Sequence, residues 1–274
     1  CETLLPRHFL HSAACGGIPQ LSAINFALPV WIVKQKWNRT TGVTAQTNPS
    51  QAAPFANVVE RMQSMLAGDL TATEALLVDR AKSPVDVIPD LSGYIVSAGG
   101  KRLRPMITLI AAHIAGGANA GTHALATAVE FIHTATLLHD DVVDDSDLRR
   151  GKRAAKNVWG NNASILVGDF LFARSFMMMV DAGSMDALHV LSRAASVIAE
   201  GEVRQLAAVR NIDISRDEYM SIIDAKTAAL FSAAAQVAPI LYGSDKAIED
   251  GLETYGRELG LAFQLVDDAL DYGG

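Results

Sequence analysis

Residues 122–147 read THALATAVEFIHTATLLHDDVVDDSD, a long apolar segment that ends in a run of aspartates. Its apolar side chains show no alternating pattern, so the segment predicts one long α-helix that begins near Thr122. At ~100° per residue, Asp140 and Asp144 differ by only ~40° and share one helix face, one turn apart. The sequence therefore gathers several carboxylates at the C-terminal end of a helix.

Asp140, Asp141 and Asp144 repel one another unless a cation lies between them. Hard oxygen ligands of this kind suit Mg²⁺ that is held together with the phosphate oxygens of a substrate. The alternative is a solvated acidic helix end. Acidic residues at a helix C-terminus oppose the helix dipole, which argues against that alternative. We interpret this first aspartate cluster as a metal site.

A second cluster of the same form, Asp267-Asp268-Ala269-Leu270-Asp271, follows another apolar segment. Gln264 lies about one turn earlier, at ~60° from Asp267. Two DDxxD clusters that face a common cavity could grip one diphosphate from both sides through bridging metals. Chance seldom supplies both.

Cationic side chains gather in two short segments. The stretch 99–105, GGKRLRP, puts three cations on a glycine turn at a helix start, where free N–H groups also favour anions. Arg149 and Arg150 follow the first cluster closely enough to neutralise a phosphate held there, and arginine suits bidentate phosphate contacts. The alternatives are an ordinary solvated loop for GGKRLRP and pairing with nearby aspartates for the two arginines.

Two further polar positions interrupt apolar helices. His133 lies seven residues before Asp140, so it projects from the same helix face two turns away. A lone histidine in an apolar helix is more often a satisfied core residue, and both interpretations stay open. Lys226-Thr227 interrupts an apolar run, and a buried ammonium group needs an anionic partner. A bound diphosphate would supply one.

The rest of the chain from Phe55 onward consists of Ala-, Leu-, Ile- and Val-rich segments separated by short Gly, Asn or Asp breaks. This texture predicts helix after helix, with Ser215 and Glu218 as a capping box and Ser244 as another start. Helices this hydrophobic must pack on several sides, so we expect one all-α bundle around a central cavity. The expected helices span residues 55–67, 70–82, 86–98, 104–115, 122–143, 162–181, 185–208, 216–242 and 246–273.

The overall composition narrows the functional classes. The 274-residue chain is 50% hydrophobic, with a formal net charge of −7. The negative charge argues against a nucleic-acid partner, because proteins that track phosphates concentrate Lys and Arg on one face. The two cysteines, Cys1 and Cys15, leave the rest of the chain without thiols, which fits a reducing compartment. Apolar stretches are either interrupted by polar residues or shorter than the ~20 residues of a membrane span, so we expect no transmembrane helix.

Residues 1–54 differ from the rest in being poor in acids. Glu2 is the single acidic residue of this segment, and its basic residues are Arg7, Lys34, Lys36 and Arg39. This Ser/Thr-bearing composition resembles an organellar transit peptide. The alternative, an upstream or vector-derived segment, is favoured because the chain begins with Cys. We therefore expect an N-terminal extension over 1–54, and a cytoplasmic protein, or a mitochondrial matrix protein if the segment is a transit peptide.

The ordered motifs GGKRLRP, HTATLLHDDVVDDSDLRRG, KTAALF and FQLVDDALD are similar to those of the trans-isoprenyl (polyprenyl) diphosphate synthases, closest to the octaprenyl-to-decaprenyl group that makes quinone side chains. The resemblance covers residues 57–274. It implies the all-α isoprenoid-synthase fold, usually a homodimer, with Mg²⁺, isopentenyl diphosphate and an allylic prenyl diphosphate such as farnesyl or geranylgeranyl diphosphate. Members continue well past the second motif, so we expect the synthase domain, residues 55–274, to be C-terminally truncated.

The resemblance also implies roles for the matching residues. The residues that resemble the isopentenyl diphosphate contacts are Lys101, Arg104, His133 and Arg150. The residues that resemble the Mg²⁺ ligands on the two sides of the cavity are Asp140, Asp144, Asp267 and Asp271. The residues that resemble the allylic diphosphate contacts are Arg149, Lys226, Thr227 and Gln264. We also count Asp141, Asp268 and Lys226 with the catalytic groups.

Product length is the last expectation. In this family bulky aromatics at the positions of Ala135 and Thr136 block elongation early, and both residues are small here, which implies a product of roughly C40 to C50 by analogy. One alternative is a terpene cyclase of the same helical class, although two DDxxD motifs together with GGKRLRP favour elongation. The other is a non-catalytic partner subunit of a heteromeric synthase, but such subunits tend to lose one acidic cluster and this chain keeps both.

Overall fold

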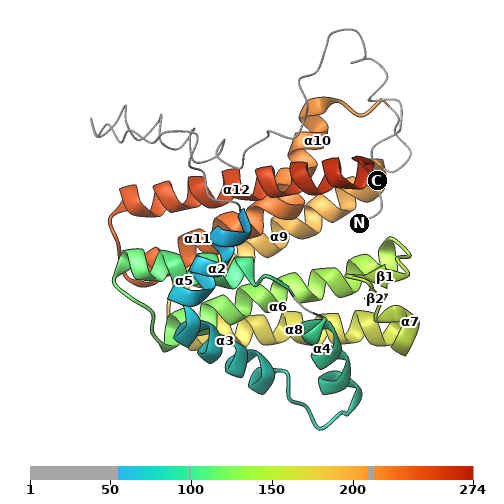
Figure 1. Ribbon diagram of the computed structural model, residues 1–274, viewed down its shortest axis with the longest axis horizontal. Helices are drawn as coiled ribbons and strands as arrows, with labels where there is room; N and C mark the ends of the chain where they lie inside the picture. The colour runs from blue at the N-terminus through green and yellow to red at the C-terminus, as the bar shows by residue number, and fades with distance from the viewer. Residues whose placement is uncertain (1–54, 99, 209–212, 274) are drawn as a thin grey trace.

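The computed structural model describes residues 55–98, 100–208 and 213–273, and side chains within 58–270 of these ranges. These residues form an all-α bundle with one short β-hairpin, as the sequence predicts apart from the hairpin (Figure 1). The segment 1–54 and the side chain of Asp271 lie outside this description. The helices before the hairpin are α2 (Phe55–Met65), α3 (Ala67–Arg80), α4 (Val87–Ser97), α5 (Leu103–Ala115) and α6 (Ala120–Val143).

The second half of the chain begins with the hairpin and ends in a long helix. The elements are β1 (Leu148–Arg149), β2 (Lys152–Arg153), α7 (Lys156–Trp159), α8 (Asn161–Asp181), α9 (Met185–Ala208), α10 (Arg216–Ile223), the π-helical turn η4 (Asp224–Ala228), α11 (Ala229–Leu241) and α12 (Lys246–Gly273). The single helix expected over 216–242 is therefore wrong in one respect, because η4 interrupts it. Figure 1 shows α6 and α12 ending on the same side of the molecule, with the hairpin at that end.

Helix caps explain where two of these helices begin. Asn119 caps α6 by accepting from the Thr122 backbone N–H at 3.0 Å, while the Asn119 N–H donates to Thr122 Oγ1 at 2.6 Å. Thr122 thus closes a capping box at the third residue of α6. The sequence suggested Thr122 as the start of the helix, but α6 begins two residues earlier, at Ala120. Ser215 Oγ accepts from the Glu218 N–H at 3.1 Å, which confirms the predicted start of α10.

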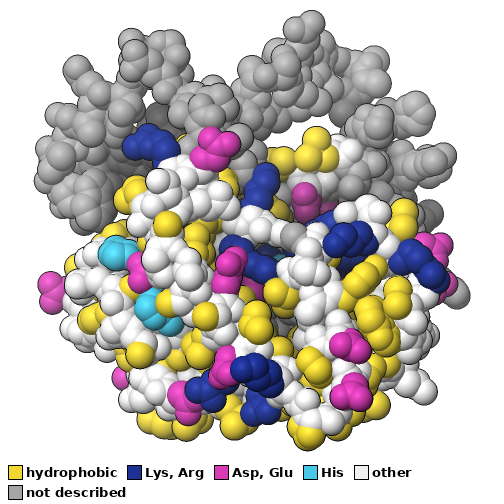
Figure 2. Space-filling model, turned by 60° about the horizontal axis from the view of Figure 1, so that its bottom comes forward, with side chains coloured by type: hydrophobic (Ala, Val, Ile, Leu, Met, Phe, Trp, Pro, Cys, Tyr) yellow, Lys and Arg dark blue, Asp and Glu magenta, His cyan; other side chains and the backbone are white. Residues whose placement is uncertain are grey.

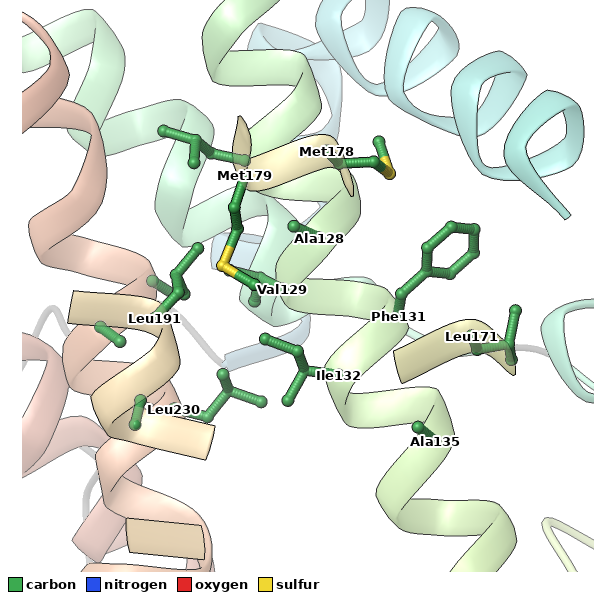
Figure 3. Packing of buried hydrophobic residues seen from close by; sticks show 14 of the residues in the cluster. Ala128, Val129, Phe131, Ile132, Ala135, Leu171, Met178, Met179, Leu191 and Leu230 are labelled. Carbon is green, nitrogen blue, oxygen red and sulfur yellow. The ribbon is translucent and has the colours of Figure 1, made fainter. Parts of the chain in front are cut away.

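The core lies between α6 and the helices that surround it. Val129, Ile132 and Ala135 of α6 are buried together with Leu171 and Met179 of α8 in one hydrophobic cluster, which also takes in side chains of α9 and α11 (Figure 3). A helix that is buried on most sides explains the nearly continuous apolar sequence of α6. Any polar side chain on α6 must therefore find a partner inside the bundle.

Two glycines let α12 lie unusually close to α11. A Cβ atom on Gly256 would come within 2.5 Å of the Phe231 carbonyl oxygen, and one on Gly260 within 2.6 Å of the Ala228 Cα atom. Side chains at these positions would push the helices apart. The sequence of α12 therefore fixes its distance from η4 and α11, and with it the position of the second aspartate cluster.

One described helix, α8, is long and apolar enough to cross a membrane, judged by length and composition alone. Only 39% of its apolar window is buried, but its inner face, including Val167 and Leu171, packs into the core of the bundle. Core helices of soluble proteins pass the same test. The helix is thus weak evidence for a membrane span.

Candidate active site at the ends of α6 and α12

The first aspartate cluster occupies the last turn of α6 and the residue after it. Asp140 and Asp141 are buried, with 7% and 1% of their surface exposed, whereas Asp144, the C-cap residue, is half-buried. Buried carboxylates at a helix C-terminus are unfavourable unless positive charge lies nearby. Each of the two buried aspartates has such a partner.

The partner of Asp140 is Lys226 from η4. Lys226 Nζ lies 3.8 Å from Asp140 Oδ2 and donates a hydrogen bond to Glu202 Oε2 on α9 at 3.0 Å. Burial raises the pKa of Asp140 to about 7; Lys226 opposes this shift, and the like charges of Glu202 and Asp144 add to it. Burial likewise raises the pKa of Glu202. Asp140 and Glu202 thus share one ammonium group, and the nearby charge of Asp144 adds to the excess of negative charge.

The partner of Asp141 is Arg149. Arg149 Nε and Nη2 donate to Asp141 Oδ1 at 2.9 and 2.5 Å, while Asp141 Oδ2 is buried without a hydrogen-bond partner among the described residues. Arg149 is held by the β1–β2 hairpin, whose two-residue turn, Arg150-Gly151, has φ angles of 52° and 75°. Two positive φ angles are the requirement of a tight type I′ hairpin turn.

The second cluster is more open, and its Asp268 is held by neutral groups. Asp267 is exposed and Asp268 half-buried near the end of α12. Asp268 accepts from Gln264 Nε2 at 2.8 Å and from the Tyr219 hydroxyl at 2.5 Å. Thr227 Oγ1 in turn donates to Gln264 Oε1 at 2.7 Å.

The π-helical turn η4 connects the two clusters. Lys226 lies beside Asp140, and its neighbour Thr227 reaches the second cluster through Gln264. The absence of a side chain on Gly201 lets α9 approach closely, because a Cβ atom there would lie 3.0 Å from the Lys226 backbone nitrogen. Two residues that are adjacent in sequence therefore link the ends of α6 and α12.

Arg104 and His133 form a cationic unit next to these clusters. Arg104 Nη1 lies 3.2 Å from His133 Nε2, and the guanidinium carbon lies 4.4 Å from the centre of the Phe231 ring. Burial, followed by the charge of Arg104, holds the pKa of His133 well below its usual value, so Nε2 accepts the hydrogen bond. Burial also lowers the pKa of Arg104 to about 10, which keeps its charge at neutral pH. Arg104 Nε is buried without a hydrogen-bond partner among the described groups.

The glycine loop before α5 meets the hairpin at one point. A Cβ atom on Gly100 would lie 2.8 Å from Arg150 Nη1, so this glycine leaves the space that the guanidinium group fills. Lys101 and Arg150 are both exposed. The two cationic segments that were far apart in the sequence thus come together.

The two predicted product-length residues differ in their surroundings. Ala135 is 1% exposed and belongs to the hydrophobic core, whereas Thr136 is half-buried and its hydroxyl donates to the His133 carbonyl at 2.8 Å. Thr136 shares the half-buried face of α6 with His133. The central cavity itself stays a prediction.

Sequence reasoning missed three residues of this region. They are Glu202, which binds Lys226; Tyr219, which binds Asp268; and Glu130, which forms a buried ion pair at 2.6 Å with Arg102, one of the three cations of GGKRLRP. A glutamate in the apolar stretch before His133 was a visible signal for Glu130. Glu202 and Tyr219 stand among polar neighbours in the sequence and gave no such signal.

The donor set suits a hard divalent cation. Among the described residues no three His, Cys, Asp or Glu side chains stand close enough to hold a metal ion by themselves. Mg²⁺ usually binds to one or two carboxylates and completes its shell with water and phosphate oxygens. The excess negative charge around Asp140 and the unpaired oxygen of Asp141 fit such a cation.

Comparison with known proteins identifies the family. The sequence model described as "Polyprenyl synthetase" matches residues 85–274. Octaprenyl diphosphate synthase from Escherichia coli (strain K12) is 51% identical over 214 residues, covering 78% of this chain and 66% of that protein. All-trans-nonaprenyl-diphosphate synthase (geranyl-diphosphate specific) from Rhodobacter capsulatus is 44% identical over 209 residues, covering 76% and 64%. The chain thus spans about two thirds of the length of these relatives.

A solved structure agrees with both the fold and the sequence. The crystal structure of polyprenyl synthase from Caulobacter crescentus CB15, complexed with calcium and isoprenyl diphosphate, is 54% identical, has a TM-score of 0.77, and is matched over 79% of this chain and 66% of that chain. The fold is that of the all-α isoprenoid synthases. This chain belongs to the polyprenyl synthetase family, the trans-isoprenyl diphosphate synthases.

Proposed function

We propose that this protein is a Mg²⁺-dependent prenyltransferase that lengthens an allylic diphosphate with isopentenyl diphosphate. The product would be an all-trans polyprenyl diphosphate of roughly C40 to C50, by analogy with its relatives, and would serve as a quinone side chain. The octaprenyl and nonaprenyl synthases among the relatives support this length class.

The observation that carries the proposal is the position of Lys226 and Thr227 between the two aspartate clusters. A diphosphate bound there would meet carboxylates on two sides through metal ions and a buried ammonium group on a third. The polyprenyl synthase from Caulobacter crescentus, crystallised with calcium and isoprenyl diphosphate, supports binding of a divalent cation and a diphosphate in the family.

Asp140 and Asp144 on α6, with Asp267 and Asp271 on α12, are the residues that would hold Mg²⁺. Bound there, the ion supplies Lewis-acid stabilisation of a departing diphosphate. Lys226 adds a fixed positive charge beside the first cluster, which favours the charge that develops on the diphosphate as the allylic C–O bond breaks.

The remaining groups orient the two substrates. The residues that would hold isopentenyl diphosphate are Lys101, Arg104, His133 and Arg150. The residues that would contact the allylic diphosphate are Arg149, Lys226, Thr227 and Gln264. The isopentenyl double bond then attacks the allylic cation, and the proton lost afterwards passes to the released diphosphate. The reaction needs no nucleophile from the protein, and His133, kept neutral by burial, contributes a hydrogen bond rather than a charge.

We also propose that the chain forms a homodimer, as the family resemblance implies, and an exposed apolar stripe on α8 supports this. Leu166, Met177 and Val180 are 66%, 49% and 64% exposed. At ~100° per residue they lie on one face of the helix. Large apolar side chains aligned in this way are typical of a surface that another chain covers.

The test is to incubate the purified chain with farnesyl diphosphate, isopentenyl diphosphate and Mg²⁺ and to separate the products by length. We expect polyprenyl diphosphates, and no turnover when isopentenyl diphosphate is left out. Turnover of farnesyl diphosphate alone would indicate a cyclase. Absence of any product, from this chain and from a longer form that reaches the full length of its relatives, would favour the non-catalytic subunit.

Product length offers a finer test. Replacing Thr136 with Phe is expected to shorten the product, because the larger ring would stand in the path of the chain below Asp140. Ala135→Tyr should act in the same direction, but Ala135 is buried in the core, where overpacking costs ~1–3 kcal/mol. Thermal melting therefore accompanies the product analysis. An unchanged product from a stable Thr136→Phe variant would place the floor of the cavity elsewhere.

A further inference from the structure

The ion pair between Arg102 and Glu130 lies behind the cationic loop. Arg102 Nη1 donates to Glu130 Oε1 at 2.6 Å, and Nη2 donates to the Val96 carbonyl at 2.9 Å. Only 14% of the Arg102 side chain and 7% of the Glu130 side chain are exposed. These contacts tie the loop before α5 to α6 and to the last turn of α4.

This arrangement is costly and therefore calls for a reason. Arg102 has a φ of 50°, in the left-handed region that non-glycine residues rarely occupy and that persists only where surrounding contacts enforce it. A buried ion pair also gains little stability by itself, because both charges lose their hydration. Stability of the fold alone is a weak explanation for the pair.

The neighbours of Arg102 suggest a better explanation for the buried ion pair. Lys101 is exposed and Arg104 turns toward His133, whereas Arg102, between them, turns into the protein. Glu130 lies three residues before His133 on α6, less than one turn away. The ion pair therefore relates the loop directly to the part of α6 that carries His133.

Charge supports the same interpretation. The groups that act on Arg150 are Glu130, which is attractive, and Arg102 and Arg149, which are repulsive. For Arg104 the attractive groups are Glu130 and Asp267, and the repulsive group is Arg150. Glu130 is thus the acid common to both, and it offsets repulsion that would otherwise spread the cations apart.

We propose that Arg102 and Glu130 are positioning residues for the isopentenyl diphosphate site, which fix Lys101 and Arg104 relative to His133 before the substrate binds. The inference rests on the proposed function, since it assigns a support to one of its two substrate sites. A loop that is ordered in advance binds more tightly, because the ordering cost is not taken from the binding energy. The substrate held by this loop should depend on the pair far more than the allylic substrate does.

The experiment measures binding of isopentenyl diphosphate by calorimetry without Mg²⁺, and KM for both substrates during elongation. The variants are Arg102→Met, Glu130→Gln, and the double change Arg102→Met with Glu130→Leu. The control is Arg80→Met, which removes another interhelical ion pair, Arg80 to Asp181 at 3.1 Å, away from the site. Melting temperatures are recorded for all of them.

For Arg102→Met we expect about tenfold weaker binding of isopentenyl diphosphate, since small misplacements of binding groups have effects of this size or larger. KM for farnesyl diphosphate should stay within about twofold, as should both constants in Arg80→Met. The double variant leaves no unpaired buried charge, so its melting temperature should recover. Its binding of isopentenyl diphosphate should stay weak, because the anchor is still missing.

The proposal fails if Arg102→Met binds isopentenyl diphosphate as tightly as the parent, or if the double variant regains binding along with stability. Should Arg102→Met not fold, Glu130→Gln, which keeps the side-chain volume, is judged by the same loss of binding. A parent chain that binds isopentenyl diphosphate without elongating anything contradicts the proposed function but still tests the pair. A parent chain that does not bind it at all overturns both.

Discussion

The two aspartate clusters share a sequence motif but are built differently. In the first cluster, Asp140 and Asp141 are buried, and each faces a cation. In the second, Asp267 is exposed, and Asp268 is held by the neutral side chains of Gln264 and Tyr219. The same DDxxD motif therefore places Asp140 and Asp141 inside the protein but Asp267 and Asp268 near its surface.

This difference indicates how much each cluster depends on the protein around it. A cation beside a carboxylate adds Coulomb attraction between two full charges, which a neutral donor does not supply, and burial strengthens that attraction. The first cluster comes with positive charge in place, whereas Asp268 of the second cluster is held by neutral donors. Substitutions around the first cluster should accordingly have the larger effects.

Asp140→Asn should have the largest effect. We expect the elongation rate to fall by about 10²–10³, the usual loss when one strong electrostatic group at a reacting centre is removed. Asp267→Asn is the matched change in the second cluster and should cost less. Steady-state kinetics at saturating Mg²⁺ compare the two. Equal losses would show that burial does not separate the clusters, and a loss below tenfold at Asp140 would contradict its role.

The Asp140→Asn variant should also be more stable than the parent at pH 8 in metal-free buffer. The pKa of Asp140 is about 7 in the folded protein, above the ordinary value of 3.8 for an aspartate, so the folded state holds a proton that the unfolded state releases. This lowers the free energy of unfolding as pH rises from about 4 to about 7, with the full penalty above that. Thermal melts at pH 5 and pH 8 with a chelator measure the difference, which should grow with pH.

Lys226→Met tests the cation of the first cluster. We expect a rate loss of about 10²-fold, since the variant removes the ammonium group from beside the reacting diphosphate. It also leaves Glu202 without its hydrogen-bond donor, which should lower the free energy of unfolding by about 1–3 kcal/mol. Kinetics and chemical denaturation measure the two effects. A loss of stability without a loss of rate would make Lys226 a structural residue.

Thr227→Val tests the next residue in the chain and should have the smallest effect. The change keeps the shape of the side chain and removes the hydrogen bond to Gln264, a neutral contact of about 0.5–1.5 kcal/mol. We expect a rate loss of less than about tenfold, measured under the same conditions as for Lys226→Met. If Lys226→Met and Thr227→Val reduce the elongation rate equally, the distinction between charged partners in the first cluster and neutral partners in the second is wrong.

Much of the fold could be predicted from the sequence because its helices are long and apolar. The expected helix over 185–208 has the bounds of α9, and Ser215 caps α10 as its sequence suggests. The hairpin Leu148–Arg153 was not predicted, because strands of two residues have no periodicity to detect. Nor was η4, since a π-turn differs from an α-helix only in its hydrogen bonds, which depend on packing against Gly201 and α12.

The site was predictable by residue type but not by partner. The sequence pointed to Lys101, Arg102 and Arg104 as a cationic group, but not to the inward turn of Arg102, which depends on Glu130 from another helix. In the same way, it suggested an anion for Lys226 and could not identify Glu202. Charges that are distant in the chain meet only through tertiary packing, and a single sequence carries no record of those distances.

The π-helical turn η4 has a consequence for engineering. Such a turn amounts to one extra residue in an α-helix. Deleting one residue between Asp224 and Ala228 would allow a regular helix from Arg216 to Leu241. That helix would have better hydrogen bonds and would, considered alone, be more stable. It would also rotate α10 by ~100° relative to α11 and separate Lys226 from Asp140 or Thr227 from Gln264. A stabilised and inactive protein is the expected result, so thermostability screens of this helix should select against the very irregularity that activity requires.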